Sequence, residues 1–265
     1  MQVIKEIILS FVILFLIFTL IEKIFPAIRS KRVFRQGYKL DLFYWVLAPT
    51  INAAIKKGSA LLVIIIVASI IGLKLDESIT HGFGPVIQQP TGLMLLEMVV
   101  LGDFIGYWVH RWFHTSALWK IHAIHHSSVE LDWLSSVRVH PFNQAIGNSI
   151  TVAILLSLGF PMTALAAYLP FLIFYAILLH ANVPWSFGPF RYVIASPKFH
   201  RWHHTSEEQG LDKNFAGLFP VFDLIFGTFY MPDKQQLLKF GVLENDIPDS
   251  LWGQMMYPFR KSKTK

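Results

Sequence analysis

The sequence predicts an all-α integral membrane protein: a polytopic helical bundle with a cytoplasmic helical cap, which carries a histidine-rich site for two metal ions. Three observations lead to this fold class. Hydrophobic residues make up 54% of the 265-residue chain and charged residues only 15%, a balance typical of membrane proteins. Several long apolar runs are bounded by charged residues. Ten of the eleven histidines lie between residues 110 and 204.

The first apolar run covers residues 7–21, contains no charged residue and lies within a predicted span over 6–25. It is slightly short for a bilayer core of about 30 Å, but flanking charged side chains can reach toward the surface. A secretory signal is the alternative. It fits poorly because a basic segment, and no small-residue cleavage site, follows. We therefore expect an uncleaved anchor.

The next two apolar stretches differ in length. Residues 42–55 form a run of only fourteen residues that is closed by Lys56 and Lys57, which favours an interfacial or re-entrant segment. Residues 58–75, rich in Ile and Val, form the second predicted span. Together with the first span, these segments make up a predicted membrane-anchor region at 1–90.

A main domain is predicted at residues 91–232, followed by a C-terminal cytoplasmic tail at 233–265. The third predicted span covers 90–109 and contains Glu97 and Asp103. Residues 139–190 lack Asp, Glu, Lys and Arg altogether. That stretch is long enough for two short spans, predicted at 145–160 and 163–181, because Gly159 and Pro161 supply a break between them.

The positions of the basic residues set the predicted orientation. If the five segments span, the 26–57 loop and the polar regions after His110 share one side, and together they carry twenty of the 23 Lys and Arg residues. Counting 42–55 as a further span would divide the basic loops between both faces. Because basic residues mark cytoplasmic loops, we expect the histidines on the cytoplasmic side of a bacterial inner membrane or the endoplasmic reticulum.

Composition excludes several kinds of site. The chain has no cysteine, which excludes disulfides, thiolate metal sites, iron–sulfur clusters and cysteine nucleophiles. The net charge of +6 comes without a compact Lys/Arg run that alternates with stacking aromatic residues outside the apolar segments. We therefore expect no nucleic-acid partner.

The histidines occur at ligand spacing. His110 and His114 are four residues apart, and the pattern H-x-x-H-H occurs at 122–126 and again at 200–204. Residues three and four apart lie on one helix face, roughly 5–6 Å from each other, so each cluster can direct two or three imidazoles at one point. Neutral imidazole suits zinc, copper, iron and nickel. The candidate ligands are His110, His114, His122, His125, His126, His140, His180, His200, His203 and His204. This number exceeds the needs of one tetrahedral zinc and favours two metal ions with open positions.

One carboxylate lies on the same predicted helix face as the first histidines. Asp103 lies four residues before Tyr107, which lies three residues before His110. An acidic residue at membrane depth is a functional candidate, and metal-bound imidazoles usually donate their other N–H to a carboxylate or carbonyl. We expect Asp103 to orient a ligand without binding metal itself. A carboxylate that only reaches interfacial water is the alternative.

These residues resemble the fatty acid hydroxylase/sterol desaturase superfamily of membrane di-metal oxygenases. The resemblance extends over residues 95–230 and rests on the order and spacing of seven motifs. They are D-F-I-G-Y-W-V-H-R-W-F-H at 103–114, H-A-I-H-H at 122–126, R-V-H-P at 138–141, H-A-N at 180–182, H-R-W-H-H at 200–204, D-K-N-F-A-G at 212–217 and D-L-I-F-G-T at 223–228.

The resemblance implies that 91–232 is a catalytic domain with a non-haem di-iron centre. Such a centre would use O₂ to hydroxylate or desaturate a lipid acyl chain or a sterol-like substrate from the bilayer, and zinc would replace iron in overexpressed samples. Nine of the histidines are carried over as ligands. Some members have a longer H-x-x-x-H pattern whose last position is Pro184 here, so His140 is expected to compensate.

The resemblance also suggests supporting residues and a partner. Residues in the matched motifs that are expected to lie behind the ligands are Asp103, Tyr107, Asn182, Asp212 and Asn214. No catalytic residue beyond the metal ligands is expected. Because the sequence has no haem-ligand pattern of a fused cytochrome b5 domain, we expect electrons from a separate electron-transfer protein.

Two other functions stay open on the sequence. A histidine-rich metal transporter should carry its ligands near the bilayer midplane on discontinuous helices, whereas the predicted clusters gather at one face. A zinc-dependent membrane hydrolase should carry a matched H-E-x-x-H pattern, which this sequence lacks.

Overall fold

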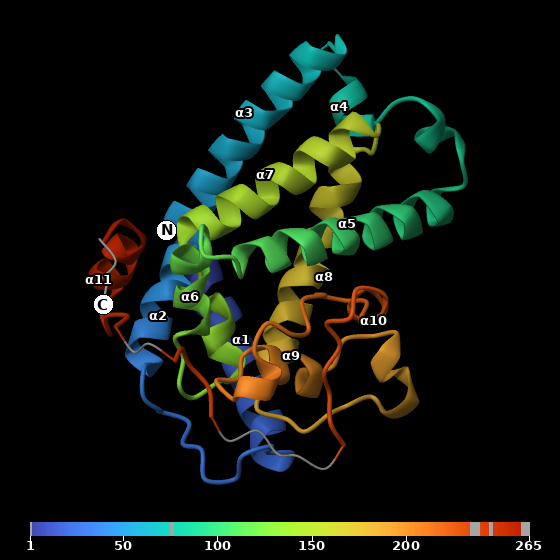
Figure 1. The fold of residues 1–265 in the computed structure, drawn as a ribbon. Coiled ribbons are helices and arrows are strands. Elements are labelled where there is room, and N and C mark those ends of the chain that lie inside the picture. The colour runs from blue at the N-terminus through green and yellow to red at the C-terminus, as the bar shows by residue number, and fades with distance from the viewer. Residues whose placement is uncertain (1, 75–76, 234–238, 244–245, 261–265) are drawn as a thin grey trace.

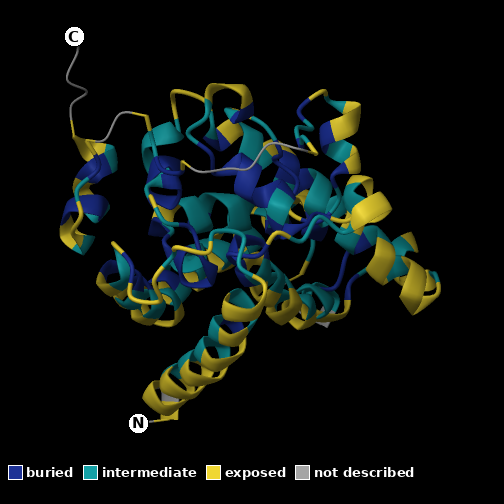
Figure 2. Ribbon diagram, turned by 90° about the horizontal axis from the view of Figure 1, so that it is seen from below, coloured by how far each residue is buried: buried dark blue, intermediate teal, exposed yellow. Residues whose placement is uncertain are grey.

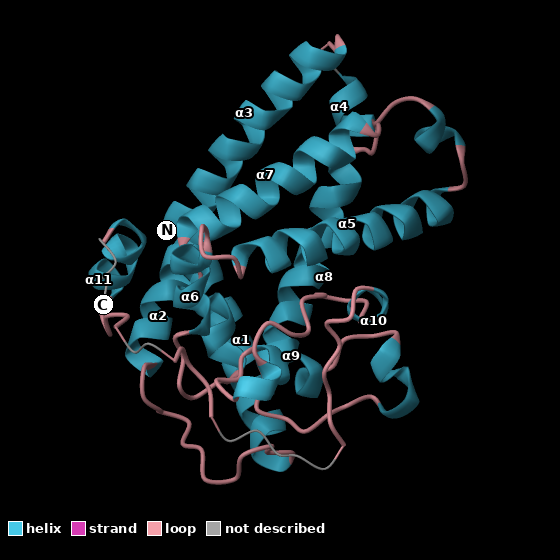
Figure 3. Ribbon diagram, in the orientation of Figure 1, coloured by secondary structure: helices cyan, strands magenta, loops and turns pink. Residues whose placement is uncertain are grey.

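Regular structure in this chain is helical. The computed structural model describes residues 2–74, 77–233, 239–243 and 246–260. Within these ranges no strand occurs (Figure 3), and Thr205 and Phe240 form only an isolated β-bridge. The predicted all-α fold class is confirmed for the part of the chain that the structure describes.

The helices fall into long and short ones. The long helices are α1 (Gln2–Ile24), α2 (Tyr38–Leu47), α3 (Ala53–Ile71), α5 (Thr91–Phe113), α7 (Pro141–Ser157) and α8 (Met162–His180). The short helices are α4 (Glu77–His81), α6 (Trp119–His126), α9 (Pro197–His203), α10 (Val221–Ile225) and α11 (Leu251–Met256). A π-helical turn covers Ala48–Asn52, and 3₁₀ turns cover Pro85–Gln88, Trp133–Val137, Gly188–Tyr192, Glu208–Gly210 and Tyr257–Phe259.

Four helical segments are long and apolar enough to cross a membrane. They are Ile4–Ile24, Tyr38–Ile71, Thr91–Phe113 and Met162–His180. Their outward faces carry bare apolar side chains: Leu16 is 62% exposed and Ile70 77%. Apolar surfaces that extend along whole helices are unfavourable in water but are stable against lipid. The chain is therefore a multi-pass membrane protein.

The structure joins two segments that the sequence separates. The run at 42–55 and the span at 58–75 lie on one continuous helical path, Tyr38–Ile71, of 34 residues. At 1.5 Å per residue this path is about 51 Å long, well beyond the roughly 30 Å of the hydrocarbon core. Lys56 and Lys57 do not end the helix, because lysine is a good helix former. The helix ends instead at Gly72, which has the left-handed φ of 70° that glycine adopts readily.

The predicted span at 145–160 corresponds to α7, which has 17 residues and is not among the four long apolar segments. It packs between α3 and α5 (Figure 1). The break before α8 occurs where predicted, with Gly159 at a φ of 89°. Its carbonyl accepts a hydrogen bond from the Phe83 amide at 3.0 Å, so the α7–α8 turn and the loop after α4 lie side by side.

A cap of short helices and loops gathers at one end of the long helices (Figure 1). We define the cap as residues 114–140 and 181–233. Most of the buried residues lie here and where the long helices enter, while α1 extends outward with exposed sides (Figure 2). Trp202, Phe199 and Leu131 are among the fully buried side chains of its main core. The cap thus has a packed core on which a site can be positioned.

A buried ion-pair network ties α2 to the cap. Arg35 donates to Asp132 from Nε and to Asp41 from Nη2, both at 2.7 Å, and Arg138 donates from Nε to the other oxygen of Asp41 at 2.6 Å. Burial alone would raise the pKa of Asp132, but Lys31 and Arg35 hold it well below its usual range. These charges are paired as buried charges must be, and the network fixes the segment from which Arg138 enters the site.

Candidate metal centre

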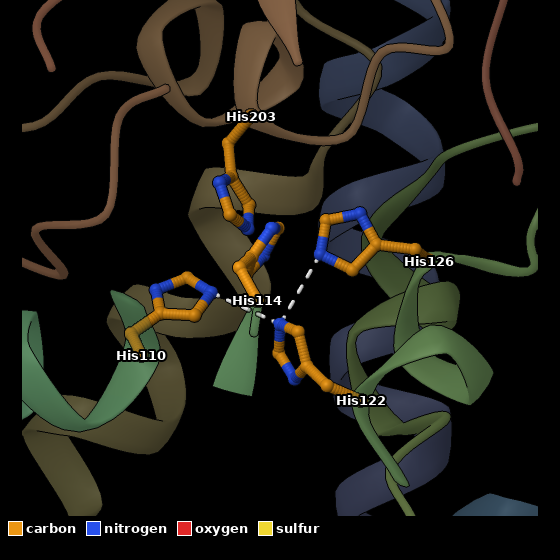
Figure 4. Close-up of side chains that lie close together, drawn as sticks. All are labelled: His110, His114, His122, His126 and His203. Carbon is orange, nitrogen blue, oxygen red and sulfur yellow. Dashed lines mark hydrogen bonds between the residues drawn. The ribbon is translucent and has the colours of Figure 1, made fainter. Parts of the chain in front are cut away.

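One group of imidazoles comes from three helices. The α5 end contributes His110 and His114, α6 contributes His122 and His126, and α9 contributes His203 (Figure 4). One nitrogen of each ring lies within 4.8 Å of all the others. The Nε2 atom of His122 is 3.1 Å from that of His110 and 3.2 Å from that of His126. We call these five residues the first group.

A second group adjoins the first. It consists of His125 from α6, His180 at the end of α8, and His200 and His204 from α9. The Nε2 atom of His180 is 3.2 Å from the Nε2 atoms of both His125 and His200, and His204 Nε2 is 3.1 Å from His200 Nε2. The rings of His126 and His204 stack across the boundary between the groups, with centroids 4.3 Å apart.

Each H-x-x-H-H motif divides between the two groups. On α6, His122 and His126 belong to the first group and His125 to the second; on α9, His203 belongs to the first and His200 and His204 to the second. Two of the three imidazoles of each motif meet at one point, within the prediction of two or three. The third faces the other group because consecutive residues on a helix point about 100° apart, so neighbours such as His125 and His126 face different centres.

Most rings turn their Nδ1 atom outward to an oxygen. The acceptors for the first group are the Phe215 carbonyl for His110 at 2.7 Å, Asp212 Oδ1 for His114 at 2.9 Å, Asn143 Oδ1 for His122 at 2.8 Å and the Lys213 carbonyl for His203 at 2.8 Å. Those for the second group are the Arg138 carbonyl for His125 at 3.2 Å and the Ala176 carbonyl for His180 at 2.7 Å. Because these oxygens only accept, each of these Nδ1 atoms carries the proton.

For the six rings with an Nδ1 acceptor, this proton assignment leaves a lone pair on the facing Nε2 atom. His110 and His122 therefore direct two lone pairs at each other over 3.1 Å, and His125 and His180 do so over 3.2 Å. Two acceptors at that distance repel unless a cation lies between them. Imidazole nitrogens that share one metal at about 2.0–2.1 Å each sit roughly 3 Å apart. The observed separations fit ligands of a common metal ion.

Burial keeps these imidazoles in the metal-binding form. The pKa values of six cap histidines lie well below the ordinary value of 6.5, chiefly because burial disfavours the charged ring and secondly because other histidines surround each one; these are His122, His125, His126, His200, His203 and His204. They are neutral at pH 7, as metal binding requires. The Nε2 atoms of His114 and His203 are buried and find no hydrogen-bond partner in the described part of the chain, and a metal ion would satisfy both.

His140 lies in neither group, which corrects the prediction that it joins the ligands. Its Nε2 atom is 3.2 Å from the Met255 carbonyl and its Nδ1 atom accepts from the Phe142 amide at 3.2 Å. The reason is local. Pro141 occupies the first position of α7, which makes His140 the cap of that helix and turns its ring to its own backbone.

Asp103 does not contact an imidazole, and the expected direct hydrogen bond to a ligand was wrong. Its carboxylate accepts from three successive backbone amides, those of Gly217 at 3.1 Å, Leu218 at 2.8 Å and Phe219 at 2.7 Å. This anchors the loop that supplies the Phe215 carbonyl to His110. Asp103 thus supports a ligand through the loop and not by touching it.

The other predicted supporting residues differ in whether they contact a candidate ligand. Asp212 does contact a ligand, His114. Tyr107 bonds Thr228 at 2.9 Å, Asn182 pairs with both backbone groups of Ile28 at 3.1 Å, and Asn214 donates to the carbonyls of Phe199 and Tyr230 at 2.9 and 2.7 Å. These last three stabilise cap loops and do not reach the rings.

Sequence reasoning missed Asn143 and the carbonyl acceptors. Asn143 is a polar residue on the first turn of α7, two residues after the matched R-V-H-P motif, and that position was the signal available. The carbonyls of Phe215, Lys213, Arg138 and Ala176 have no sequence signal, since every residue carries one.

Comparisons with known proteins agree with this geometry. The sequence model described as fatty acid hydroxylase matches residues 95–228, about half of the chain. Ornithine lipid hydroxylase OlsE of Rhizobium tropici is 26% identical over 179 residues, which cover 67% of this chain and 54% of that protein. Alkylglycerol monooxygenase of Homo sapiens is 34% identical over 131 residues, covering 48% of this chain and 28% of that protein.

A plant relative extends the comparison. Very-long-chain aldehyde decarbonylase CER1 of Arabidopsis thaliana is 29% identical over 175 residues, which cover 60% of this chain and 27% of that protein. The chain thus matches about half or less of the length of these relatives. No solved structure matches the chain.

Proposed function

The chain belongs to the fatty acid hydroxylase family, and from this premise we propose that it is a membrane-bound, di-iron, O₂-dependent oxygenase that hydroxylates or desaturates a lipid. The substrate would be an acyl chain or a sterol-like molecule taken from the bilayer. Two relatives are named for the oxidation of lipids, an ornithine lipid and an alkylglycerol, which supports a lipid as the substrate class.

The observation that carries the proposal is the set of facing Nε2 lone pairs in two adjoining groups. Each group offers four or five imidazole nitrogens, which suits a divalent ion of the iron type with a position left for dioxygen. Soluble di-iron bundles use Glu and Glu-x-x-His pairs instead. Here neither group includes a carboxylate among its ligand atoms.

Two iron ions bound by these groups would supply the activation of dioxygen that an unreactive C–H bond requires. In hydroxylation, one oxygen atom of O₂ enters the C–H bond and the other leaves as water, with two electrons from a separate donor protein and two protons. The chain's own part is to hold six of the nine rings with their Nε2 atoms inward, through Asp212, Asn143 and four backbone carbonyls. The absence of cysteine leaves no thiol in the chain for a strong oxidant to attack.

Metal content tests the di-metal part of the proposal. We expect two ions per chain, bound by the two histidine groups, from elemental analysis and from anomalous scattering by crystals of the purified protein. A single ion per chain, or ligation mainly by carboxylates, would contradict the di-metal arrangement. Zinc in place of iron would not, because imidazole sites take up zinc when iron is scarce.

Lipid analysis tests the activity. Cells that express the protein should accumulate a hydroxylated or desaturated lipid, and cells that express His125→Ala should not. His81→Ala is the matched control, since His81 lies on α4 outside both groups and should leave the product unchanged. Equal lipid profiles in all strains, together with metal uptake that depends on His125, would favour a transporter.

A further inference from the structure

A cavity of ≈ 330 Å³ adjoins the first histidine group. Its walls come from α3, α5, α6 and α7, and His110 and His122 are part of them. Asn143, another wall residue, is the acceptor for His122 Nδ1. A molecule in this cavity therefore touches both a candidate ligand and the residue that orients it.

The cavity has one cationic side chain and no acidic one among its described wall residues. The cation is Lys56 of α3, which is half-buried. None of the ion pairs in the described part of the chain includes it. A partly desolvated ammonium group without a counter-charge is unfavourable, so an anion in the cavity would be stabilised there.

Two glycines keep the cavity open. A Cβ atom added to Gly106 of α5 would meet nothing within 4 Å, and one added to Gly147 of α7 would first meet Val109 at 3.7 Å. Both glycines belong to the cavity wall, although glycine inside a helix is unfavourable by about 1 kcal/mol. The space beside them is available to a ligand.

The helix that carries Lys56 is irregular one turn earlier. The π-helical turn ends at Asn52, four residues before Lys56 and hence on the same helix face. Asn52 is 1% exposed, and neither side-chain atom has a hydrogen-bond partner in the described residues. Such turns occur often at functional sites; Asn52 itself is not a wall residue of the cavity, and a buried amide without a partner calls for a water beside it.

We propose that this cavity binds the anionic head of the lipid substrate, a phosphate or carboxylate, with Lys56 as its counter-charge. The inference rests on the proposed function and adds the substrate class to it. Because His110 and His122 form part of the same wall as Lys56, a head group bound there places the first carbons of its chain near the first histidine group, and oxidation falls on a carbon close to the head.

Ligand binding tests the proposal without any turnover. The full-length protein, purified in a neutral detergent, is titrated with radiolabelled dodecyl phosphate, dodecanoate and dodecanol. We expect both anions to bind more tightly than the alcohol. Lys56→Met should raise the Kd of the anions about tenfold or more, since contacts to charged groups are the stronger ones, and should leave the Kd of dodecanol unchanged.

The neighbouring lysine is the matched control. Lys57 has the same charge on the same helix but is exposed and is not a wall residue, so Lys57→Met should leave all three Kd values unchanged, and Lys56→Arg should restore anion binding. Equal effects of the two Met variants would overturn the assignment of Lys56. So would anions that bind no better than dodecanol.

Two further experiments test where the ligand binds and whether the bound anion is a lipid head group or free phosphate. Gly106→Leu should fill the cavity and weaken the binding of all three ligands. Gly92→Leu, on an open part of the same helix, should not weaken their binding. Equal effects of the two variants would mean that the ligand binds elsewhere. Inorganic phosphate should not compete with dodecyl phosphate at equal concentration. Effective competition would mean a site for free phosphate and would overturn the lipid assignment.

The outcomes are separable from those for the proposed function. Metal content is measured on every variant, and Lys56→Met should keep the wild-type metal content, which also shows that it folds. If anion binding depends on Lys56 but cells form no lipid product, the proposed oxygenase activity is wrong and the anion site is supported. If cells that express Lys56→Met form as much lipid product as the wild type, the oxygenase activity is supported and the anion site is wrong.

Discussion

The hydrogen bond from His122 to Asn143 decides which nitrogen of that ring faces the first group. Without the acceptor, the His122 ring could move its proton to Nε2 and turn away from the metal. We predict that Asn143→Ala lowers zinc affinity about 10–100-fold, the usual effect of losing an outer-shell partner. Asn143→Asp, which keeps an acceptor oxygen, should lose much less. Chelator competition on purified protein measures both.

Asn148 provides the control at this scale. It also lies on α7 and in the cavity wall, but no hydrogen bond to a candidate ligand is recorded for it among the described residues. Asn148→Ala should keep the affinity for zinc. If Asn143→Ala and Asn148→Ala behave alike, the orienting role of Asn143 is wrong.

Asp103 affects a whole structural element, because its carboxylate holds the loop of Gly217 to Phe219 against α5. Asp103→Asn removes the charge and one acceptor oxygen from a carboxylate that holds three amides, so we predict a stability loss of about 1–3 kcal/mol. The protein should keep most of its metal while product formation falls. His125→Ala should lose both. Metal content and turnover must be compared on the same preparations.

Two results would count against this role. If Asp103→Asn empties the site as thoroughly as His125→Ala, Asp103 is a ligand or is required for folding. If Asp103→Asn changes neither stability nor turnover, the loop of Gly217 to Phe219 does not depend on the carboxylate.

Elements were more predictable from the sequence than their meeting points. The long apolar runs at 6–25 and 90–109 predicted α1 and α5 because composition alone decides whether a helix can face lipid. The break at Lys56 was wrong, since lysine interrupts apolarity but not a helix. Nine of the ten expected histidines come together in the two groups, and their ligand spacing on helix faces was the local signal. The division of each motif between two groups depends on how α6 and α9 pack, which spacing does not encode.

At the scale of the whole molecule, the shared histidine groups constrain how often the chain crosses the membrane. The α6 ligands precede α7 and α8, and the α9 ligands follow them, yet both contribute to the same groups. The chain between them must cross an even number of times. If α8 crosses, as its 19 apolar residues indicate, the shorter α7 must cross as well. The contact between Phe83 and Gly159 agrees, because it joins the two loops expected on the far side.

This reasoning predicts the outcome of labelling with a membrane-impermeant thiol reagent. The chain has no native cysteine, so single cysteines report cleanly. Cysteine at Glu208, exposed in the cap, should react only from the cytoplasmic side, and cysteine at Thr80 only from the opposite side. Ser262, in the predicted cytoplasmic tail, lies outside the described residues and should react like Glu208. Reaction of positions 80 and 208 from one side would refute the five-span arrangement.

The interleaving of the two histidine groups has a consequence for assembly of the site. Because α6 and α9 each contribute to both groups, an ion bound in one group, as we propose, also orders helices that carry ligands of the other. Binding of the first ion thus includes part of the loss of conformational entropy that is needed to order the second site. The second ion then binds to ligands that are already ordered. The two ions should therefore enter cooperatively, so that half-filled protein is scarce during loading.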